Sequence, residues 1–386
     1  MIPKANRLNN VQEYYFSKKL REVSILEKEG KPIINIAIGS PDLQPPIQVI
    51  EAIKSTVEID NAHSYQSYQG IPELRLAMCN FYKRMYNVVL KNDEVLPLMG
   101  SKEGIMLISL AFLNTGDEVL IPNPGYPTYS SVTNLVGAKP IFYNLNEENN
   151  WLPDFDELEQ QNLTKVKLIW VNYPHMPTGA KASSVAFQKI ISFAKKHQIL
   201  VVNDNPYSFI LNDKPQSILE LQGAKEVALE LNSLSKSFNM AGWRVGLVAG
   251  KEKYIKAILQ VKSNMDSGMF LGIQKGAIAA LKTPEKWFTD LNLIYEKRRK
   301  IVWKIMEILN CTYTKNSSGL FVWGKLPKEK DALDFTDKLL SDKYIFITPG
   351  NIFGTNGEGY IRVSLCVPEA KLNEALQRLI VVKLKK

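Results

Sequence analysis

Short apolar runs alternate with helical patterns through the middle of the chain. The apolar runs cover residues 94–99, 118–121, 139–143, 166–171, 199–202, 227–231 and 245–249. Apolar positions at helical spacing lie between several of these runs, over residues 102–113, 129–136 and 182–197. Such alternation is typical of a mostly parallel sheet with helices on both faces. We therefore predict an α/β fold whose seven-stranded sheet has its ligand site at the carboxyl ends of the strands.

The two ends of the chain show a different mixture of elements. Helical patterns cover residues 11–29, 45–59, 251–264, 271–281, 284–309, 332–340 and 368–381, and another helix begins at Pro72. Strand patterns cover residues 32–38, 319–324, 345–348 and 360–365. We predict a large domain over residues 46–283 and a smaller α+β domain formed by residues 1–45 together with residues 284–386.

Composition and charge narrow the class of protein. The length of 386 residues suggests about two domains. The net charge of +9 comes from lysines spread along the whole chain, without the compact basic patch that nucleic-acid binding would need. The three cysteines, Cys79, Cys311 and Cys366, form neither a metal-spaced cluster nor a disulfide framework. With no signal-peptide pattern and no apolar stretch of membrane-spanning length, we expect a cytoplasmic protein.

One stretch, S-L-S-K-S-F-N-M-A-G-W-R at residues 233–244, carries the strongest chemical signal. It follows an apolar run and places Lys236 among the hydroxyls of Ser233 and Ser235, with Arg244 eight residues downstream. A lysine in a site that excludes water loses ammonium character and can attack a carbonyl to form a Schiff base. A nearby arginine and hydroxyls suit a phosphate. These are the requirements of pyridoxal phosphate, although a solvated lysine on a loop is the simpler alternative.

Other polar residues follow the predicted strands. Ser101 and Lys102 open a helix whose N-terminus could seat a phosphate, although serine is also an ordinary helix cap. Asp204 ends an apolar strand, and Tyr207 follows it. A buried carboxylate there could keep a pyridine nitrogen protonated, or it could simply cap a turn. Tyr126 stands in a rigid turn, either to stack on a flat cofactor or to fill the core.

Three further residues are candidates for binding a substrate. Arg362 lies inside an apolar strand and needs a partner, either a substrate carboxylate or an internal acid. Gly39 ends a predicted strand and permits a close backbone approach, or only a turn. Asn172 directly follows the predicted strand 166–171 and is the third candidate substrate-binding residue.

In this order and at these spacings, the residues resemble the fold-type I pyridoxal-phosphate aminotransferases of class I/II. This group includes the aspartate, alanine and LL-diaminopimelate aminotransferases. The resemblance runs from about Gly39 to Arg362, and residues 233–244 are its most specific part.

The resemblance implies a role for each candidate residue. Lys236 would form the Schiff base with pyridoxal phosphate and shuttle the proton. Asp204 would pair with the ring nitrogen, Tyr207 would bond the ring oxygen O3′, and Tyr126 would stack on the ring. The cofactor phosphate would be bound by Ser101, the Lys102 backbone N–H, Ser233, Ser235 and Arg244. Arg362 would bind the substrate α-carboxylate with Gly39 lining the same pocket, and Tyr65 would reach the phosphate of the neighbouring subunit in a homodimer.

One position departs from the family pattern. The family usually reads N-P-T-G where this chain has Met176-Pro177-Thr178-Gly179. A thioether cannot donate the second hydrogen bond that the asparagine gives to O3′. We therefore predict a Schiff-base pKa above the family norm, unless Asn172 or a water molecule supplies the bond.

The resulting hypothesis is an aminotransferase that moves an amino group between an L-amino acid and a 2-oxo acid. A carbon–sulfur β-lyase on the same fold is the alternative enzyme, because the same cofactor supports several bond cleavages. A non-enzymatic alternative is the effector domain of a transcription regulator. That alternative requires an additional helix-turn-helix region, which we do not expect here. The sequence does not identify the amino donor.

Overall fold

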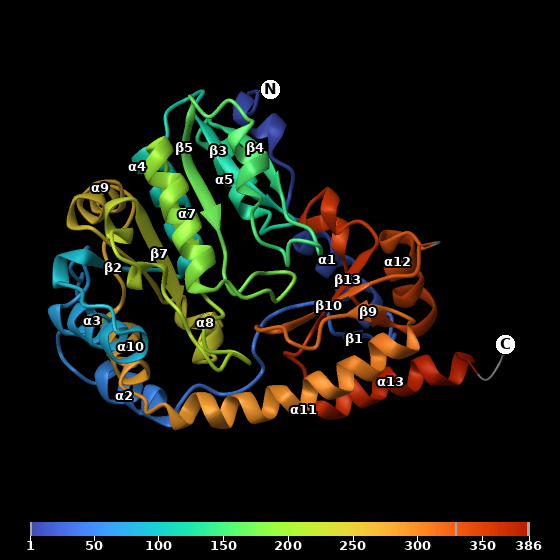
Figure 1. Ribbon diagram of the computed structural model, residues 1–386. Helices are drawn as coiled ribbons and strands as arrows, with labels where there is room; N and C mark the ends of the chain where they lie inside the picture. The colour runs from blue at the N-terminus through green and yellow to red at the C-terminus, as the bar shows by residue number, and fades with distance from the viewer. Residues whose placement is uncertain (1, 329, 384–386) are drawn as a thin grey trace.

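The computed structural model describes residues 2–328 and 330–383, and its centre is a seven-stranded sheet (Figure 1). The strands are β2 (Val95–Leu98), β3 (Glu118–Asn123), β4 (Lys139–Asn144), β5 (Val166–Val171), β6 (Leu200–Asp204), β7 (Ala228–Ser233) and β8 (Gly246–Gly250). Their order is β2-β8-β7-β6-β5-β3-β4, and only β8 runs antiparallel to its neighbours. The predicted α/β fold with a mostly parallel seven-stranded sheet is confirmed.

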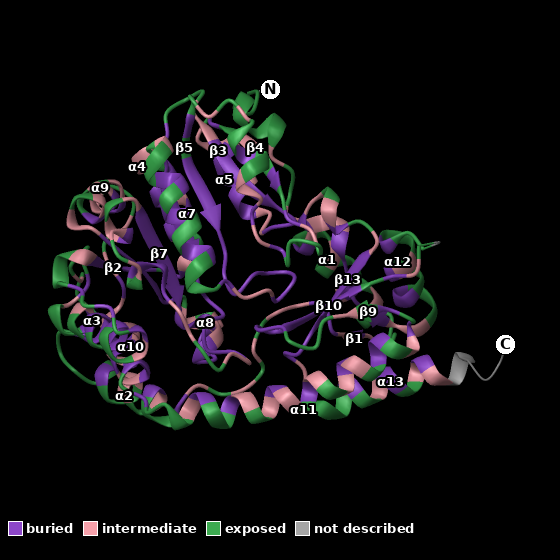
Figure 2. Ribbon diagram, viewed as in Figure 1, coloured by how far each residue is buried: buried purple, intermediate pink, exposed green. Residues whose placement is uncertain are grey.

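Helices cover both faces of this sheet. They are α2 (Ile47–Val57), α3 (Pro72–Tyr86), α4 (Ser101–Phe112), α5 (Thr128–Leu135), α7 (Ser184–His197), α9 (Glu252–Lys262) and α10 (Leu271–Leu281). Alternate residues of each strand point to opposite faces. Trp170 and Val202 pack with α4, α5 and α9, whereas Val171 and Val201 belong to the core that contains α3, α7 and α10. The strands other than the edge strand β4 are therefore largely buried on both sides (Figure 2).

The two ends of the chain meet in a second, smaller group of elements. Its strands are β1 (Ile34–Asn35), β9 (Thr312–Tyr313), β10 (Phe321–Lys325), β11 (Ile345–Phe346), β12 (Thr348–Pro349) and β13 (Tyr360–Ser364). Its helices are α1 (Tyr15–Lys28), α11 (Lys286–Ile308), α12 (Ala332–Lys343) and α13 (Glu369–Lys383). The strands form an antiparallel sheet in the order β12-β13-β10-β9 and a parallel pair of β1 with β11. The long helix α11 runs along the base of the molecule and packs on α13 (Figure 1).

The short elements differ most from the sequence prediction. Within the expected strand 32–38 only β1 pairs as a strand, because Asn35 Oδ1 accepts from the Ala37 N–H and turns the chain. The next residue, Ile36, still bonds to Phe346 on one side and to Ser364 on the other. The sequence analysis did not predict β9, α6 (Phe155–Glu159) or α8 (Leu234–Ser237), nor the 3-10 helices at Asn6–Asn10, Asn92–Glu94, Ile218–Glu220, Ala224–Glu226, Ala241–Trp243, Gly350–Phe353 and Thr355–Gly357.

Two observations concern the expected environment of the chain. Among the residues that the structure describes, no helix combines the length and the apolar character needed to cross a membrane. Cys79, Cys311 and Cys366 are all buried and free.

Candidate active site

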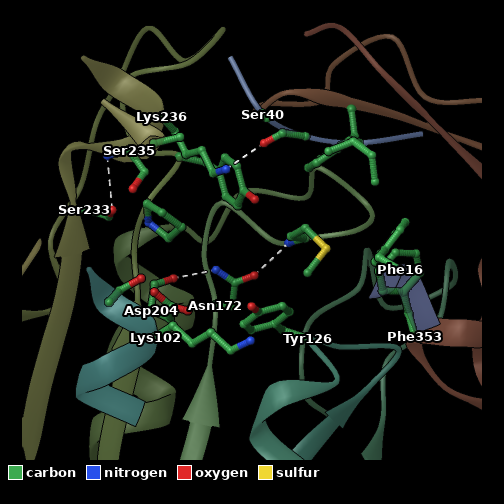
Figure 3. A pocket seen from close by; sticks show the side chains of 18 of the residues that line it. Phe16, Ser40, Lys102, Tyr126, Asn172, Asp204, Ser233, Ser235, Lys236 and Phe353 are labelled. Atoms are coloured by element: carbon green, nitrogen blue, oxygen red, sulfur yellow. Dashed lines mark hydrogen bonds between the residues drawn. The ribbon is translucent and has the colours of Figure 1, made fainter. Parts of the chain in front are cut away.

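A cavity of about 500 Å³ lies at the carboxyl ends of β5, β6 and β7, beside the smaller group of elements (Figure 3). It brings together twelve of the residues predicted from the sequence, namely Gly39, Ser101, Lys102, Tyr126, Asn172, Asp204, Tyr207, Ser233, Ser235, Lys236, Arg244 and Arg362. The thirteenth, Tyr65, lies outside this cavity with 92% of its surface exposed.

Lys236 is the amine of this cavity. It lies in the short helix α8, which starts where Ser233 caps the end of β7 by accepting from the Ser235 N–H. The Lys236 Nζ donates a 2.6 Å hydrogen bond to the carbonyl of Gly39. Burial lowers the pKa of Lys236, and the charges of Arg362 and Arg244 act in the same direction. More of this amine is therefore neutral and nucleophilic at neutral pH than in a solvated lysine.

Asp204 carries a buried carboxylate oxygen without a partner. The Tyr129 hydroxyl donates to its Oδ2 at 2.9 Å, whereas its Oδ1 has no hydrogen-bond partner among the described residues. Burial raises the pKa of Asp204 to about 6, and the bond from Tyr129 partly opposes this. A positively charged N–H donor placed against Oδ1 would satisfy the orphaned oxygen and hold the carboxylate ionised. The site thus fits the protonated ring nitrogen of pyridoxal phosphate.

The wall formed by the start of α4 and by Arg244 provides hydrogen-bond donors for an anion. Helix α4 starts at Ser101 after Gly100, whose φ of 82° places it in the left-handed region, and no side chain caps this helix end. The Arg244 guanidinium lies against Gly100, since a Cβ added there would be 2.1 Å from its Nη2. Arg244 Nη1 also donates to the Ser235 hydroxyl at 3.5 Å. Free helix N–H groups, a guanidinium and hydroxyls together suit a phosphate dianion.

Four tyrosines, Tyr14, Tyr126, Tyr129 and Tyr207, line the space between these walls. Tyr207 is buried, and its ring contacts Phe321 edge to face, with centroids 6.0 Å apart. Tyr126 packs edge to face on Tyr129, and its hydroxyl interacts with that of Tyr14. Tyr14 and Tyr129 were not among the residues predicted from the sequence. Tyr129 lies only three residues after Tyr126 in a helix, but its bond to Asp204 depends on the strand order.

Arg362 comes from β13 and is only 4% exposed. Its Nη2 donates to the Ala37 carbonyl at 2.9 Å, and its Nη1 lies 3.2 Å from Met176 Sδ. Its Nε has no partner, and no described acid lies within 4.0 Å. Burial lowers the pKa of Arg362 to about 10. The internal salt bridge that the sequence left open is therefore not found in the described structure.

The side chain of Asn172 forms hydrogen bonds with backbone groups. Its Nδ2 donates to the carbonyl of Asp204, and its Oδ1 accepts from the Met176 N–H at 2.8 Å. These bonds join the ends of β5 and β6 and hold the loop that carries Met176 (Figure 3). Its predicted contact with a substrate stays a prediction.

Comparisons with known proteins agree with this geometry. The family model for aminotransferase class I and II matches residues 31–379. The chain is 39% identical over 378 residues, 97% of each chain, to an LL-diaminopimelate aminotransferase from Dehalococcoides mccartyi. It is 38% identical over 387 residues, 100% of each chain, to an LL-diaminopimelate aminotransferase from Aquifex aeolicus. Among solved structures, apo-BacF from Bacillus subtilis superposes with a TM-score of 0.95 at 36% identity, covering 100% of this chain and 99% of that one. An aminotransferase from Staphylococcus aureus superposes with a TM-score of 0.90 at 32% identity, covering 99% of both chains.

Proposed function

Because the chain belongs to the class I and II aminotransferases, we propose that this cavity is its active site and that Lys236 is the catalytic amine. The protein is a pyridoxal-phosphate-dependent transferase that moves an amino group between an L-amino acid and a 2-oxo acid. One observation carries the assignment of the site. A buried amine, an unpartnered buried carboxylate oxygen and an uncapped helix N-terminus with its arginine line the same cavity.

Each wall of the cavity has a part in holding the cofactor. Pyridoxal phosphate, when bound, supplies an aldehyde for the amino group and a ring that withdraws electrons from the substrate Cα. Asp204 Oδ1 would pair with the ring nitrogen and keep it protonated. Lys236 Nζ would hold the cofactor and accept or return the Cα proton. Tyr126 would lie against the ring, and the Tyr207 hydroxyl would donate to its oxygen.

The phosphate-binding residues come from two helix starts and one loop. The N–H of Lys102 and the hydroxyl of Ser101 stand at the positive end of α4. Ser233, Ser235 and Arg244 complete the cup. Arg244 Nη1 donates a 3.0 Å hydrogen bond to the Ala241 carbonyl. This bond helps to orient the guanidinium for an anion.

The substrate carboxylate binds at Arg362. Its unpartnered Nε and the weak sulfur acceptor at Nη1 leave donors that a carboxylate can take in a bidentate pair. Gly39 and Asn172 line the same space, with the Gly39 carbonyl 2.6 Å from the Lys236 amine.

The active unit is a homodimer in the cytoplasm, built from the predicted large domain over residues 46–283 and a small domain from residues 1–45 and 284–386. The Tyr65 side chain is 92% exposed and lies outside the cavity of its own chain, which leaves it free to reach a neighbouring subunit. The three free, buried cysteines are consistent with a reducing compartment.

Reconstitution with pyridoxal phosphate tests this assignment. The wild-type protein should give a visible absorption band that Lys236→Ala cannot give. A single L-amino acid should then remove the band and release its 2-oxo acid without ammonia. Release of ammonia and pyruvate from a thioether amino acid would instead favour the β-lyase, which the relatives do not support. A normal band in Lys236→Ala would show that Lys236 is not the attachment point.

A further inference from the structure

The end of the cavity farthest from Asp204 has apolar walls. Figure 3 shows Phe16 and Phe353 on the side opposite Ser233, Ser235 and Asp204. The lining there comes from Tyr14, Phe16 and Leu20 near helix α1, together with Ile38, Phe321 and Phe353. A substrate whose carboxylate binds Arg362 and whose amine meets Lys236 has these side chains around its remaining part.

Aromatic rings also enclose the Arg362 guanidinium. Its Cζ lies 3.8 Å from the ring centroid of Phe321, 4.7 Å from that of Phe353 and 5.6 Å from that of Phe16. These cation–π contacts hold the guanidinium in place when no carboxylate is present. Because the rings already face one cation, a second cation in the same pocket would be repelled by Arg362.

The charged side chains that line the cavity leave no partner for a second ammonium. They are Lys102, Asp204, Lys236, Arg244 and Arg362. Asp204 is the only acid among the described lining residues, and the proposed function assigns it to the ring nitrogen. Lys102 has its Nζ 5.1 Å from the ring centroid of Tyr14, so it can pair only with an anion. The loop 65–70, which the proposed dimer brings from the neighbouring subunit, reads Y-Q-S-Y-Q-G and contains no charged residue.

We propose that this pocket selects an amino donor with a large apolar side chain, aromatic or branched aliphatic, and discriminates against diaminopimelate. The proposal rests on the proposed function and names the substrate class of that site. An apolar side chain gains by leaving water for the walls formed by Phe16, Ile38 and Phe353. The distal half of diaminopimelate carries a carboxylate, which Lys102 could meet, and an ammonium, which would have to lose water there without an acidic side chain in the described lining. The chain thus differs in donor choice from the relatives whose names contain diaminopimelate.

Single-turnover reactions of the loaded enzyme test this choice. Phenylalanine, leucine, glutamate and LL-diaminopimelate are mixed separately with the enzyme, and the loss of the visible band is followed. The expected result is that phenylalanine or leucine reacts at least about tenfold faster than diaminopimelate at equal concentration, as expected for one unpaired buried charge. A diaminopimelate rate equal to or above the apolar donors would overturn the proposal. If none of the four removes the band, the proposed function itself is wrong.

A matched pair of variants tests the charge argument directly. Leu20 is 38% exposed at the cavity, so substitution there leaves the core intact. Leu20→Glu would give a distal ammonium its missing partner, whereas Leu20→Gln has the same shape without the charge. We expect Leu20→Glu to raise the diaminopimelate-to-phenylalanine rate ratio at least about tenfold over Leu20→Gln. An equal ratio in the two variants contradicts the proposal.

Ligand binding provides a readout that does not require turnover. 3-Phenylpropanoate, which lacks the amine, should bind more tightly than 6-(trimethylammonio)hexanoate, which carries a distal cation, in calorimetric titrations of the loaded enzyme. Phe16→Ala should reduce the affinity for 3-phenylpropanoate, whereas Val23→Ala, a buried change on the same helix away from the cavity, should not. Tighter binding of the distal cation, or equal losses in both variants, would count against an apolar pocket.

Discussion

At the scale of single residues, the buried carboxyl of Asp204 lowers the stability of the cofactor-free protein at neutral pH but strengthens cofactor binding. Burial raises its pKa to about 6 from an ordinary value of 3.8. The folded protein therefore keeps this proton to a higher pH than the unfolded chain does, and its stability falls as pH rises from about 4 to 6. A shift of about two pH units corresponds to roughly 3 kcal/mol.

The predicted effect of Asp204→Asn follows from this fall in stability with rising pH. Without cofactor, the variant should be about 3 kcal/mol more stable than the wild type at pH 7 and nearly equal to it at pH 4. Urea unfolding at both pH values measures this. With cofactor this advantage should shrink by ~1.5–3 kcal/mol, because losing a charge-assisted bond of that size weakens binding of pyridoxal phosphate roughly 10- to 100-fold. A stability difference that does not depend on pH would show that the carboxyl is not protonated in the empty site.

The second prediction concerns Met176, which replaces the usual asparagine. Its sulfur lies 3.2 Å from Arg362 Nη1, where it can accept a hydrogen bond but cannot donate one to the cofactor oxygen O3′. Met176→Asn should therefore lower the pKa of the visible band of the loaded enzyme, measured by spectrophotometric titration. Met176→Leu, which also lacks a donor, should leave that pKa unchanged. Similar titrations for all three proteins would mean that another group already donates to O3′.

At the scale of the secondary-structure elements, the N-terminus of α4 depends on a glycine. A side chain at Gly100 would be strained at a φ of 82° and would collide with Arg244, since its Cβ would lie 2.1 Å from Nη2. Gly100→Ala should weaken binding of pyridoxal phosphate by at least about tenfold, because the guanidinium would be displaced from the phosphate cup. Gly116→Ala is the control, with a φ of 89° and no atom within 4 Å of the added Cβ. Equal losses of affinity in both variants would trace the effect to backbone strain alone.

The sequence predicts the individual strands and helices better than it predicts the contacts between them. All seven strands of the large sheet could be recognised, because each is a short apolar run and all except the edge strand β4 are largely buried on both faces. The unpredicted elements, such as β9, α8 and α6, are only two to five residues long and carry too little of a periodic pattern. The bounds of β1, which the sequence made too long, depend on its pairing with β11 more than three hundred residues later. Likewise Lys236 and Asp204 stood out through local patterns, whereas Phe16 is an ordinary apolar residue of α1 until the fold brings it to Arg362.

At the scale of the whole molecule, one partly buried ion pair connects helix α11 to the segments that form the site. Arg298 of α11 forms a bidentate pair with Asp42 at 2.6 and 2.9 Å, and its Nη1 also donates to the Leu365 carbonyl. Asp42 follows the Gly39 segment that contacts Lys236, and Leu365 follows the strand that carries Arg362. The long helix therefore fixes the distance between the reacting amine and the carboxylate-binding arginine. No local sequence pattern could have revealed this link, because its partners are about 256 residues apart.

The last prediction concerns the proposed homodimer, in which Tyr65 serves the site of the neighbouring subunit. Tyr65→Ala and Lys236→Ala should each be inactive or severely impaired alone. Their mixed dimer contains one site with both an intact Lys236 and an intact Tyr65 from the opposite chain. After the two variants are unfolded together and refolded at equal amounts, about a quarter of the wild-type site activity should return, because about half of the dimers are mixed.

The alternatives to this arrangement give distinct outcomes. If Tyr65 acts within its own chain, a mixed dimer has no complete site and no activity returns. If Tyr65 has only a structural role, Tyr65→Ala alone keeps most of its activity, and its free energy of unfolding changes instead. Tyr68→Ala is the matched control, since it removes a 46% exposed tyrosine from the same loop without touching the residue assigned to the phosphate. Return of activity in the mixture with Tyr65→Ala, together with nearly full activity of Tyr68→Ala alone, would place the shared contact at Tyr65. If neither result is obtained, Tyr65 does not serve the site of the neighbouring subunit.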